Sequence, residues 1–194
     1  MKNYSWKLRD IILVALLSII FGIVYLGAVY LASFLTTVLT PFGLAPLGNE
    51  ILFGIWFMVA TLAAYILQKP GVAIVAEVLA ALIEVLLGNF YGPMVIVAGI
   101  IQGAGAEIVF AAGRYRKFNW LTMLLAAAGC CVTSFVWGFF RSGFGLLSVK
   151  LLIVMFLIRL VSSVLFTGVI SKLIGDGLAR TGLLRSYALG QSEK

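Results

Sequence analysis

The sequence predicts an all-α integral membrane protein, a bundle of about six transmembrane helices that forms a single domain over residues 1–194. Hydrophobic residues make up 63% of the chain and charged residues only 11%, unlike the composition of soluble domains. A soluble fold of this length could not bury so much apolar surface. The apolar runs also lack the alternating pattern of barrel strands, so helices are the remaining way to cross a bilayer.

Charged residues divide the chain into six apolar runs, and a helix needs about 20 residues to cross a hydrocarbon core of about 30 Å. The runs cover residues 11–35, 51–67, 72–87, 94–112, 120–140 and 151–174. The second and third runs are short, and Lys69-Pro70-Gly71 predicts the turn between them. The first run is longer than the core of a secretory signal, so we interpret it as an uncleaved helix. We expect six helices, with five or seven as alternatives.

Several kinds of site are excluded by composition. Cys130 and Cys131 are adjacent in an apolar run, and neighbouring helical residues point apart, so we expect packing rather than a disulfide or metal site. The chain has no histidine and no Gly-x-x-x-x-Gly-Lys-Ser/Thr loop, which excludes histidine-based catalysis and ATP hydrolysis by the P-loop route. We expect no cofactor. An intramembrane enzyme with paired acids stays open as an alternative.

The basic residues predict the orientation of the bundle. Only Arg141 and Lys150 fall in the connections of one side, and Arg159 falls within the sixth run. The other eleven basic residues belong to the opposite side: Lys2, Lys7, Arg9, Lys69, Arg114, Arg116, Lys117, Lys172, Arg180, Arg185 and Lys194. The positive-inside rule therefore places both termini in the cytoplasm. Because these charges are scattered over short loops, they indicate topology and lipid headgroups rather than nucleic acid.

Two outer connections are candidates for a ligand site. Residues 39–49 form a long uncharged segment rich in Pro, Gly and Leu. This segment is either an interfacial loop without a role or a lid over an outward-facing pocket. Residues 88–93 predict a tight turn that carries the polar Asn89 and the aromatic Tyr91.

Two carboxylates share one face of the third predicted helix. Glu77 and Glu84 are seven residues apart, so they point within about 20° of each other. The other residues of this stripe are small: Ala73, Ala80, Ala81 and Gly88. Close helix packing explains the small residues but not the acids, because an acidic residue inside the bilayer costs at least ~2.5 kcal/mol. We therefore predict that both glutamates bind a ligand or a partner charge.

Further polar and aromatic residues are expected at a similar depth in the outer half. Gln102 lies near the middle of the fourth helix and needs a partner in lipid. The candidate binding residues are Glu84, Glu77, Asn89, Tyr91, Gln102, Trp56, Trp137, Glu50 and Arg159. The two tryptophans could instead be interfacial belt residues. Acids together with aromatic rings suit a small, flat, cationic ligand.

Two ion pairs are also expected. Arg159 needs an acidic partner inside the bundle, for which Glu84 and Glu77 are the candidates. Glu107 lies deeper, nearer the cytoplasm, and we expect it to pair with Arg114 or Arg116.

Two stretches carry a resemblance to a known family. KPGVAIVAEVLAALIEVLLGNFYGP (residues 69–93) and GAGAEIVFAAGRYRKFNW (residues 103–120) resemble the YkoE type of S component, the substrate-capture subunit of energy-coupling-factor (ECF) vitamin transporters. The length, six helices, cytoplasmic termini and missing ATPase motif extend the resemblance over the whole chain. It implies capture of thiamine or its hydroxymethylpyrimidine moiety at the bacterial cell membrane. Another vitamin is the alternative.

The resemblance also implies partner proteins. In such transporters a transmembrane coupling (T) subunit and two ATPase subunits drive release inside the cell. Many S components carry an Ala-x-x-x-Ala contact for the coupling subunit in their first helix. Ala28 and Ala32 match those letters here but lie near the outer end of the helix, so we assign the contact to Ala15, Ser18 and Gly22.

Overall fold

The computed structural model describes residues 4–192, and within this range the chain is folded into helices without any strand. Five helical segments are long and apolar enough to cross a membrane: Leu8–Phe42, Leu47–Leu67, Met94–Ala112, Trp120–Arg141 and Val149–Arg180. The helix α4, Val72–Leu86, has 15 residues and is the sixth member of the bundle. It is about 22 Å long, which is shorter than a typical hydrocarbon core. The predicted all-α membrane bundle is confirmed.

The elements follow one another with short connections. In chain order they are α1 (Leu8–Leu39), η1 (Thr40–Phe42), α2 (Leu47–Leu52), η2 (Phe53–Phe57), α3 (Met58–Leu67), α4, α5 (Met94–Ala112), α6 (Trp120–Arg141), η3 (Phe144–Leu146), α7 (Val149–Ser163), η4 (Val164–Ile170), α8 (Ser171–Arg180) and α9 (Ala188–Ser192). The second spanning segment is interrupted by the 3-10 turn η2, and the last by the π-helical η4. The sequence did not predict either interruption or α9.

The last spanning segment is longer than expected. It continues through α8 to Arg180 instead of ending near residue 174. Lys172 therefore lies inside a helix, where it is buried, and not in a cytoplasmic connection. Its Nζ lies 2.7 Å from Oδ2 of Asp176, one turn further along α8. Such pairs four residues apart stabilise a helix, which explains why the glycine-containing stretch around Asp176 remains helical.

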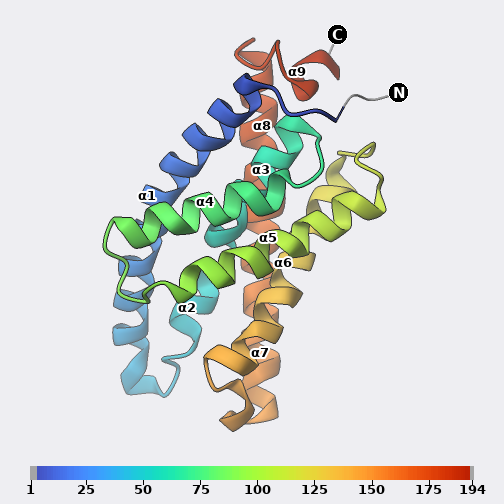
Figure 1. The fold of residues 1–194 in the computed structure, drawn as a ribbon. Coiled ribbons are helices and arrows are strands. Elements are labelled where there is room, and N and C mark those ends of the chain that lie inside the picture. Colours follow the sequence, from blue (N-terminus) through green and yellow to red (C-terminus); the bar gives the residue numbers. More distant parts are fainter. Residues whose placement is uncertain (1–3, 193–194) are drawn as a thin grey trace.

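Both ends of the described chain lie at one end of the bundle, beside α8 and α9, while the connections α1–α2 and α6–α7 lie at the opposite end (Figure 1). This arrangement agrees with an even number of crossings. Which end faces the cytoplasm remains a prediction, and Lys2 and Lys194 lie outside the described residues.

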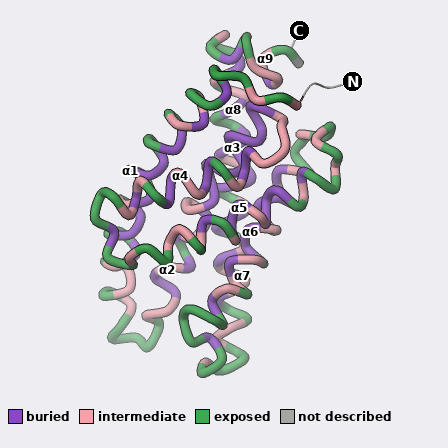
Figure 2. Tube along the Cα trace, viewed as in Figure 1, coloured by how far each residue is buried: buried purple, intermediate pink, exposed green. Residues whose placement is uncertain are grey.

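The core centres on α3, whose ten residues are all buried. Buried positions concentrate along α3 and the inward faces of its neighbours, whereas α1 and α7 carry long exposed faces (Figure 2). These exposed faces are apolar, as Ile20, Phe34 and Val161 illustrate, and an apolar exterior suits contact with lipid. Cys130 and Cys131 are buried, and Cys130 packs within the hydrophobic core.

Small residues bring α5 and α6 into close contact. A Cβ atom added at Gly105 would lie 2.6 Å from the backbone oxygen of Gly129, and one added at Gly129 would lie 2.4 Å from that of Gly105. Only glycine allows the two backbones to approach so closely. The contact fixes how α5 and α6 present Gln102, Ser134 and Trp137 on their shared side.

Candidate functional site

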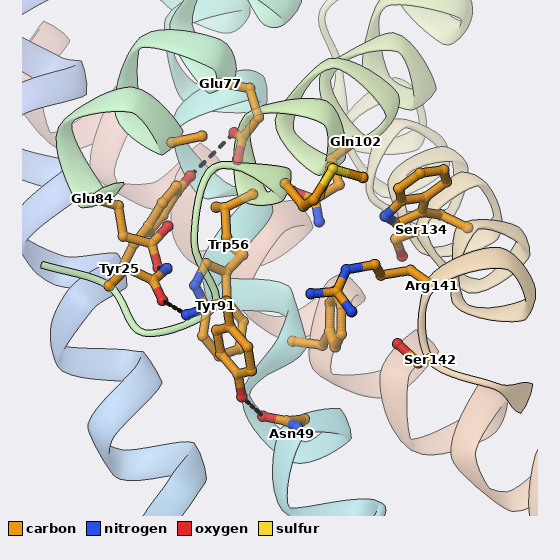
Figure 3. Close-up of a pocket in the computed structure, with 17 residues that line it drawn as sticks. Tyr25, Asn49, Trp56, Glu77, Glu84, Tyr91, Gln102, Ser134, Arg141 and Ser142 are labelled. Atoms are coloured by element: carbon orange, nitrogen blue, oxygen red, sulfur yellow. Dashed lines mark hydrogen bonds between the residues drawn. The ribbon is translucent and has the colours of Figure 1, made fainter. Parts of the chain in front are cut away.

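A cavity of about 280 Å³ is lined partly by residues at the ends of helices, among them Asn89 and Tyr91 after α4 and Arg141 and Ser142 at the end of α6. Its walls come from α1, α2, η2, α4, α5, α6, the turn between α4 and α5, and the residue that follows α6. The lining residues are Tyr25, Asn49, Phe53, Trp56, Glu77, Ala81, Glu84, Asn89, Tyr91, Met94, Val95, Ala98, Gln102, Ser134, Trp137, Arg141 and Ser142 (Figure 3). Seven of the nine predicted binding residues line this cavity, namely all except Glu50 and Arg159.

Glu84, in the last turn of α4, has one oxygen satisfied and one free. Its side chain is 1% exposed, and Oε1 accepts a hydrogen bond of 2.6 Å from Nδ2 of Asn89. Oδ1 of Asn89 in turn accepts from the backbone N–H of Tyr91 at 2.7 Å, which fixes the turn after α4. By hydrogen-bond geometry, the buried Oε2 of Glu84 has no partner among the described residues, although the indole N–H of Trp56 lies near this carboxylate. A buried acceptor without a partner costs free energy in the empty protein.

Glu77 lies two turns earlier on the same face of α4, as the spacing predicted. It is 1% exposed, and its Oε2 accepts a hydrogen bond of 3.1 Å from the phenol of Tyr25 on α1. The same phenol accepts from the backbone N–H of Val59 at 3.2 Å, which ties α1, α3 and α4 together. Ala81 lines the cavity between the two acids, so the small residues of the stripe leave space in front of the carboxylates.

Aromatic side chains form much of the remaining wall. Phe53 and Trp56 come from η2, Trp137 comes from α6, and Tyr91 comes from the turn after α4. The Tyr91 hydroxyl donates to Oδ1 of Asn49 at 3.3 Å, across the rim of the cavity. Burial raises the pKa of the Tyr91 phenol, so it remains a neutral donor at physiological pH.

Glu50 and Arg159 form an ion pair behind the cavity wall. Nε and Nη2 of Arg159 donate to the two oxygens of Glu50 at 2.5 and 2.7 Å, and both residues are 2% exposed. Nη1 donates to the hydroxyl of Ser134 at 3.2 Å, and the guanidinium lies 3.6 Å from the centre of the Phe53 ring. The expected pairing of Arg159 with Glu84 or Glu77 is wrong. Because α7 packs against α2 and η2, it faces Glu50 and not the acids of α4.

Glu107 is also held differently from the prediction. Its carboxylate accepts from the backbone N–H groups of Gly71 and Ala73 at 2.6 and 3.0 Å, and from the Tyr115 hydroxyl at 2.7 Å. Arg114 and Arg116 are exposed, and neither forms an ion pair with it in the described part of the chain. The unpaired N–H groups at the start of α4 explain this outcome, because a carboxylate satisfies them directly.

The residues assigned to a partner contact lie mainly inside the bundle. The Ser18 hydroxyl donates to the backbone oxygen of Ala76 at 3.0 Å, and a Cβ added at Gly22 would lie 2.7 Å from Cγ2 of Ile83. Both residues therefore face α4, and only Ala15 is partly exposed. The alternative pair Ala28 and Ala32 is buried as well. A contact with a coupling subunit at Ala15, Ser18 and Gly22 remains a prediction, and in this structure it lacks an open surface.

Sequence reasoning missed six of the more informative lining residues: Tyr25, Asn49, Phe53, Ser134, Arg141 and Ser142. Tyr25 carried a usable signal, since it is a polar-tipped residue in the middle of an otherwise apolar run. Arg141 was noticed only as a topological charge. The others depend on which helices lie side by side.

Known proteins are similar to this chain in sequence and fold over nearly its whole length. Residues 9–133 match the family described as "ABC-type cobalt transport system, permease component". A Bacillus subtilis (strain 168) protein named "Putative HMP/thiamine permease protein YkoE" is 44% identical over 190 residues, covering 98% of this chain and 93% of the relative. A structure titled "Crystal structure of an S-component of ECF transporter" superimposes with a TM-score of 0.92 at 42% identity, covering 97% and 93% of the two chains.

These relatives are membrane transport components and not enzymes, which removes the alternative of an intramembrane enzyme. The resemblance of residues 69–93 and 103–120 is confirmed by matches that extend well beyond those two stretches. The chain belongs to the S components of ECF transporters, multi-pass membrane proteins, and within them to the YkoE type.

Proposed function

We propose that this protein captures thiamine or its hydroxymethylpyrimidine moiety in the cavity, from outside the bacterial cell, for ATP-driven uptake by partner subunits. The observation that carries the proposal is the buried Oε2 of Glu84, which faces an aromatic-walled cavity without a hydrogen-bond partner among the described residues. The name of the Bacillus subtilis relative supports the choice of ligand.

The chemistry of thiamine complements the cavity. Thiamine carries a permanently cationic thiazolium ring and an aminopyrimidine ring that presents both donors and an acceptor. A donor on the ligand would satisfy Oε2 of Glu84, and a cation would offset the cost of burying two carboxylates on one wall. Trp56, Trp137 and Tyr91 offer faces for stacking and cation–π attraction. A cavity of about 280 Å³ suits one compact ligand.

Two measurements test the identity of the ligand. A mass spectrum of material released from the denatured, purified protein should contain thiamine or hydroxymethylpyrimidine. Calorimetric titrations should then compare thiamine, hydroxymethylpyrimidine and the isolated thiazole alcohol. We expect the first two to bind and the third to bind at least tenfold more weakly, because the amino group of the pyrimidine is the matching donor for Glu84. The proposal would be contradicted if the released material were a different vitamin and if none of these three compounds bound.

The sequence has no nucleotide-binding loop, which supports the proposal that partner subunits supply the ATPase activity. Vesicles that contain this chain alone should bind the ligand but not accumulate it when ATP is supplied on either side. Addition of a coupling subunit and two ATPase subunits should restore accumulation. Concentration of the vitamin by the chain alone would show that no partner is required.

The proposed direction of capture depends on the orientation of the bundle. We expect residue 45 to face outward and residue 116 to face the cytoplasm, because of the asymmetry of the basic residues. In intact cells, a membrane-impermeant thiol reagent should label Ala45→Cys and not Arg116→Cys. The native cysteines are buried and provide little background. The reverse labelling pattern would show that the cavity opens to the cytoplasm.

A further inference from the structure

The charge of the cavity wall is asymmetric. Glu77 and Glu84 lie on α4, whereas Arg141 is the last residue of α6. The side chain of Arg141 extends from α6 into the cavity, with its guanidinium group directed towards the side where Trp56 and Tyr91 lie (Figure 3). Ser142 follows it and also lines the cavity. A ligand that complements this wall carries a positive or donor-rich end and, separately, a negative end.

Arg141 retains an uncompensated charge, in contrast to Arg159. The charge of Arg159 is neutralised by Glu50 through two hydrogen bonds, and its guanidinium is buried against the Phe53 ring. Arg141 forms no ion pair with any residue in the range 4–192, and it is exposed at the rim. Among the lining residues it is the one basic side chain, so it is the group available to an anion that enters the cavity.

The local fold holds Arg141 at this place. Gly143 adopts φ +65°, a left-handed conformation that turns the chain sharply after α6. The next residue, Phe144, is 6% exposed and packs onto Gly138, where an added Cβ would lie 2.3 Å from its ring. Since Gly138 lies one turn before Arg141, this anchor fixes the end of α6 and directs the arginine to the cavity.

We propose that Arg141 and the Ser142 hydroxyl form an anion subsite at the mouth of the cavity, which binds the phosphate group of a phosphate monoester of the vitamin. A planar guanidinium matches two phosphate oxygens, and a serine hydroxyl donates to a third. The pyrimidine end of the ester would face Glu84 while the phosphate remains at the rim. The inference rests on the proposed function and extends it from the free vitamin to its phosphorylated form.

The test compares thiamine with thiamine monophosphate by calorimetry, on the purified full chain in lipid-free detergent. Arg141→Gln should weaken binding of the monophosphate about tenfold, the low end for a charge-assisted hydrogen bond because the site is exposed. The same variant should change thiamine affinity much less, and towards tighter binding, since it removes a positive charge near a cationic ligand. Arg141→Lys should retain part of the preference. Lys150→Gln is the matched control, with the same loss of charge at the same end of the bundle but outside the cavity lining.

The outcomes separate this inference from the proposed function. If the parent protein binds thiamine but not its monophosphate, the subsite is absent and the proposed function stands. Equal losses for both ligands in Arg141→Gln would show a structural role and overturn the inference. If the variant and the parent bind the monophosphate equally well, Arg141 does not hold the phosphate and the inference is wrong. Failure of the parent to bind thiamine, its monophosphate and hydroxymethylpyrimidine would overturn the proposed function itself.

Discussion

Glu50 and Glu84 are both buried carboxylates in the same half of the bundle, but their surroundings differ. Both oxygens of Glu50 accept hydrogen bonds from Arg159. Glu84 has one oxygen bonded to Asn89 and one without a partner in the described part of the chain. The pairing of Glu50 with Arg159 is enough to explain why a charged residue is buried there. Glu84 is buried with one oxygen lacking a partner, which costs free energy unless a ligand binds it. The difference therefore identifies which acid is available to a ligand.

A third cluster, near the termini, resembles the Glu50 site. Nζ of Lys172 donates to the Tyr65 hydroxyl at 2.9 Å and to Asp176 at 2.7 Å, and the same hydroxyl donates to Asp176 at 2.5 Å. These three groups join α3 to α8 and satisfy one another. Such closed networks rigidify a bundle. The buried charged groups in the described part of the chain thus fall into closed clusters that join helices and one open cluster at the cavity, around Glu84.

The largest effect is expected when a closed pair is broken. Arg159→Met leaves Glu50 buried without its partner, which should lower the free energy of unfolding by about 3–5 kcal/mol. Thermal unfolding in detergent measures this as a clear fall in Tm. Adding Glu50→Gln to the same chain removes the orphaned charge and should recover most of the loss. If the single variant is as stable as the parent, the distinction between closed and open clusters fails.

The sequence predicted the open cluster better than the closed ones. Helical spacing placed Glu77 and Glu84 on one face, and residue types near the outer ends of the helices added Asn89, Tyr91 and Trp56. These inferences needed only local periodicity and depth. The partner of Arg159 required a choice among three acids, which depends on the helix that packs against α7. Local periodicity does not indicate which helix packs against which.

The fold shows the same difference between features that the local sequence predicts and features that depend on contacts between helices. Composition and run length predicted the membrane bundle and its approximate spans, because both follow from the thickness of the bilayer. They did not predict the π-helical segment Val164–Ile170, whose shape is linked to contacts with another helix. There the Thr61 hydroxyl donates to the backbone oxygen of Thr167, and the Thr167 hydroxyl donates to that of Gly54. Such bonds between distant parts of the chain appear only once the helices are assembled.

The second largest effect is expected at the open cluster, on binding rather than on stability. Glu84→Gln keeps the shape of the side chain and removes its charge, so it should weaken thiamine binding by roughly 1.5–3 kcal/mol, about tenfold to hundredfold. The Tm of the empty protein should not fall, because the variant removes a buried charge that lacks a complete set of partners. Calorimetric titration and thermal unfolding of the same preparation measure both quantities.

Glu107→Gln is the matched control for that variant. It removes the same charge from a carboxylate on α5. That carboxylate accepts hydrogen bonds from N–H groups at the start of α4, whereas Glu84 lies in the last turn of α4. Loss of this cap should cost about 0.5–2 kcal/mol of stability and leave ligand affinity nearly unchanged. If both variants lose the same affinity, or if Glu84→Gln loses none, Glu84 is not the principal ligand-binding carboxylate.

The smallest effect is expected at the rim, where a single hydrogen bond links the turn after α4 to the start of the second spanning segment. Tyr91→Phe deletes the donor to Asn49 but keeps the ring and the backbone bond to Asn89. A neutral, partly exposed hydrogen bond contributes about 0.5 kcal/mol, so ligand dissociation should become roughly twofold faster with little change in association. Stopped-flow fluorescence can follow this, because Trp56 and Trp137 line the cavity. Tyr30→Phe, an exposed tyrosine outside the lining, is the control. A rate unchanged in Tyr91→Phe would show that the rim bond does not restrain the ligand, and that retention depends on the open cluster around Glu84 alone.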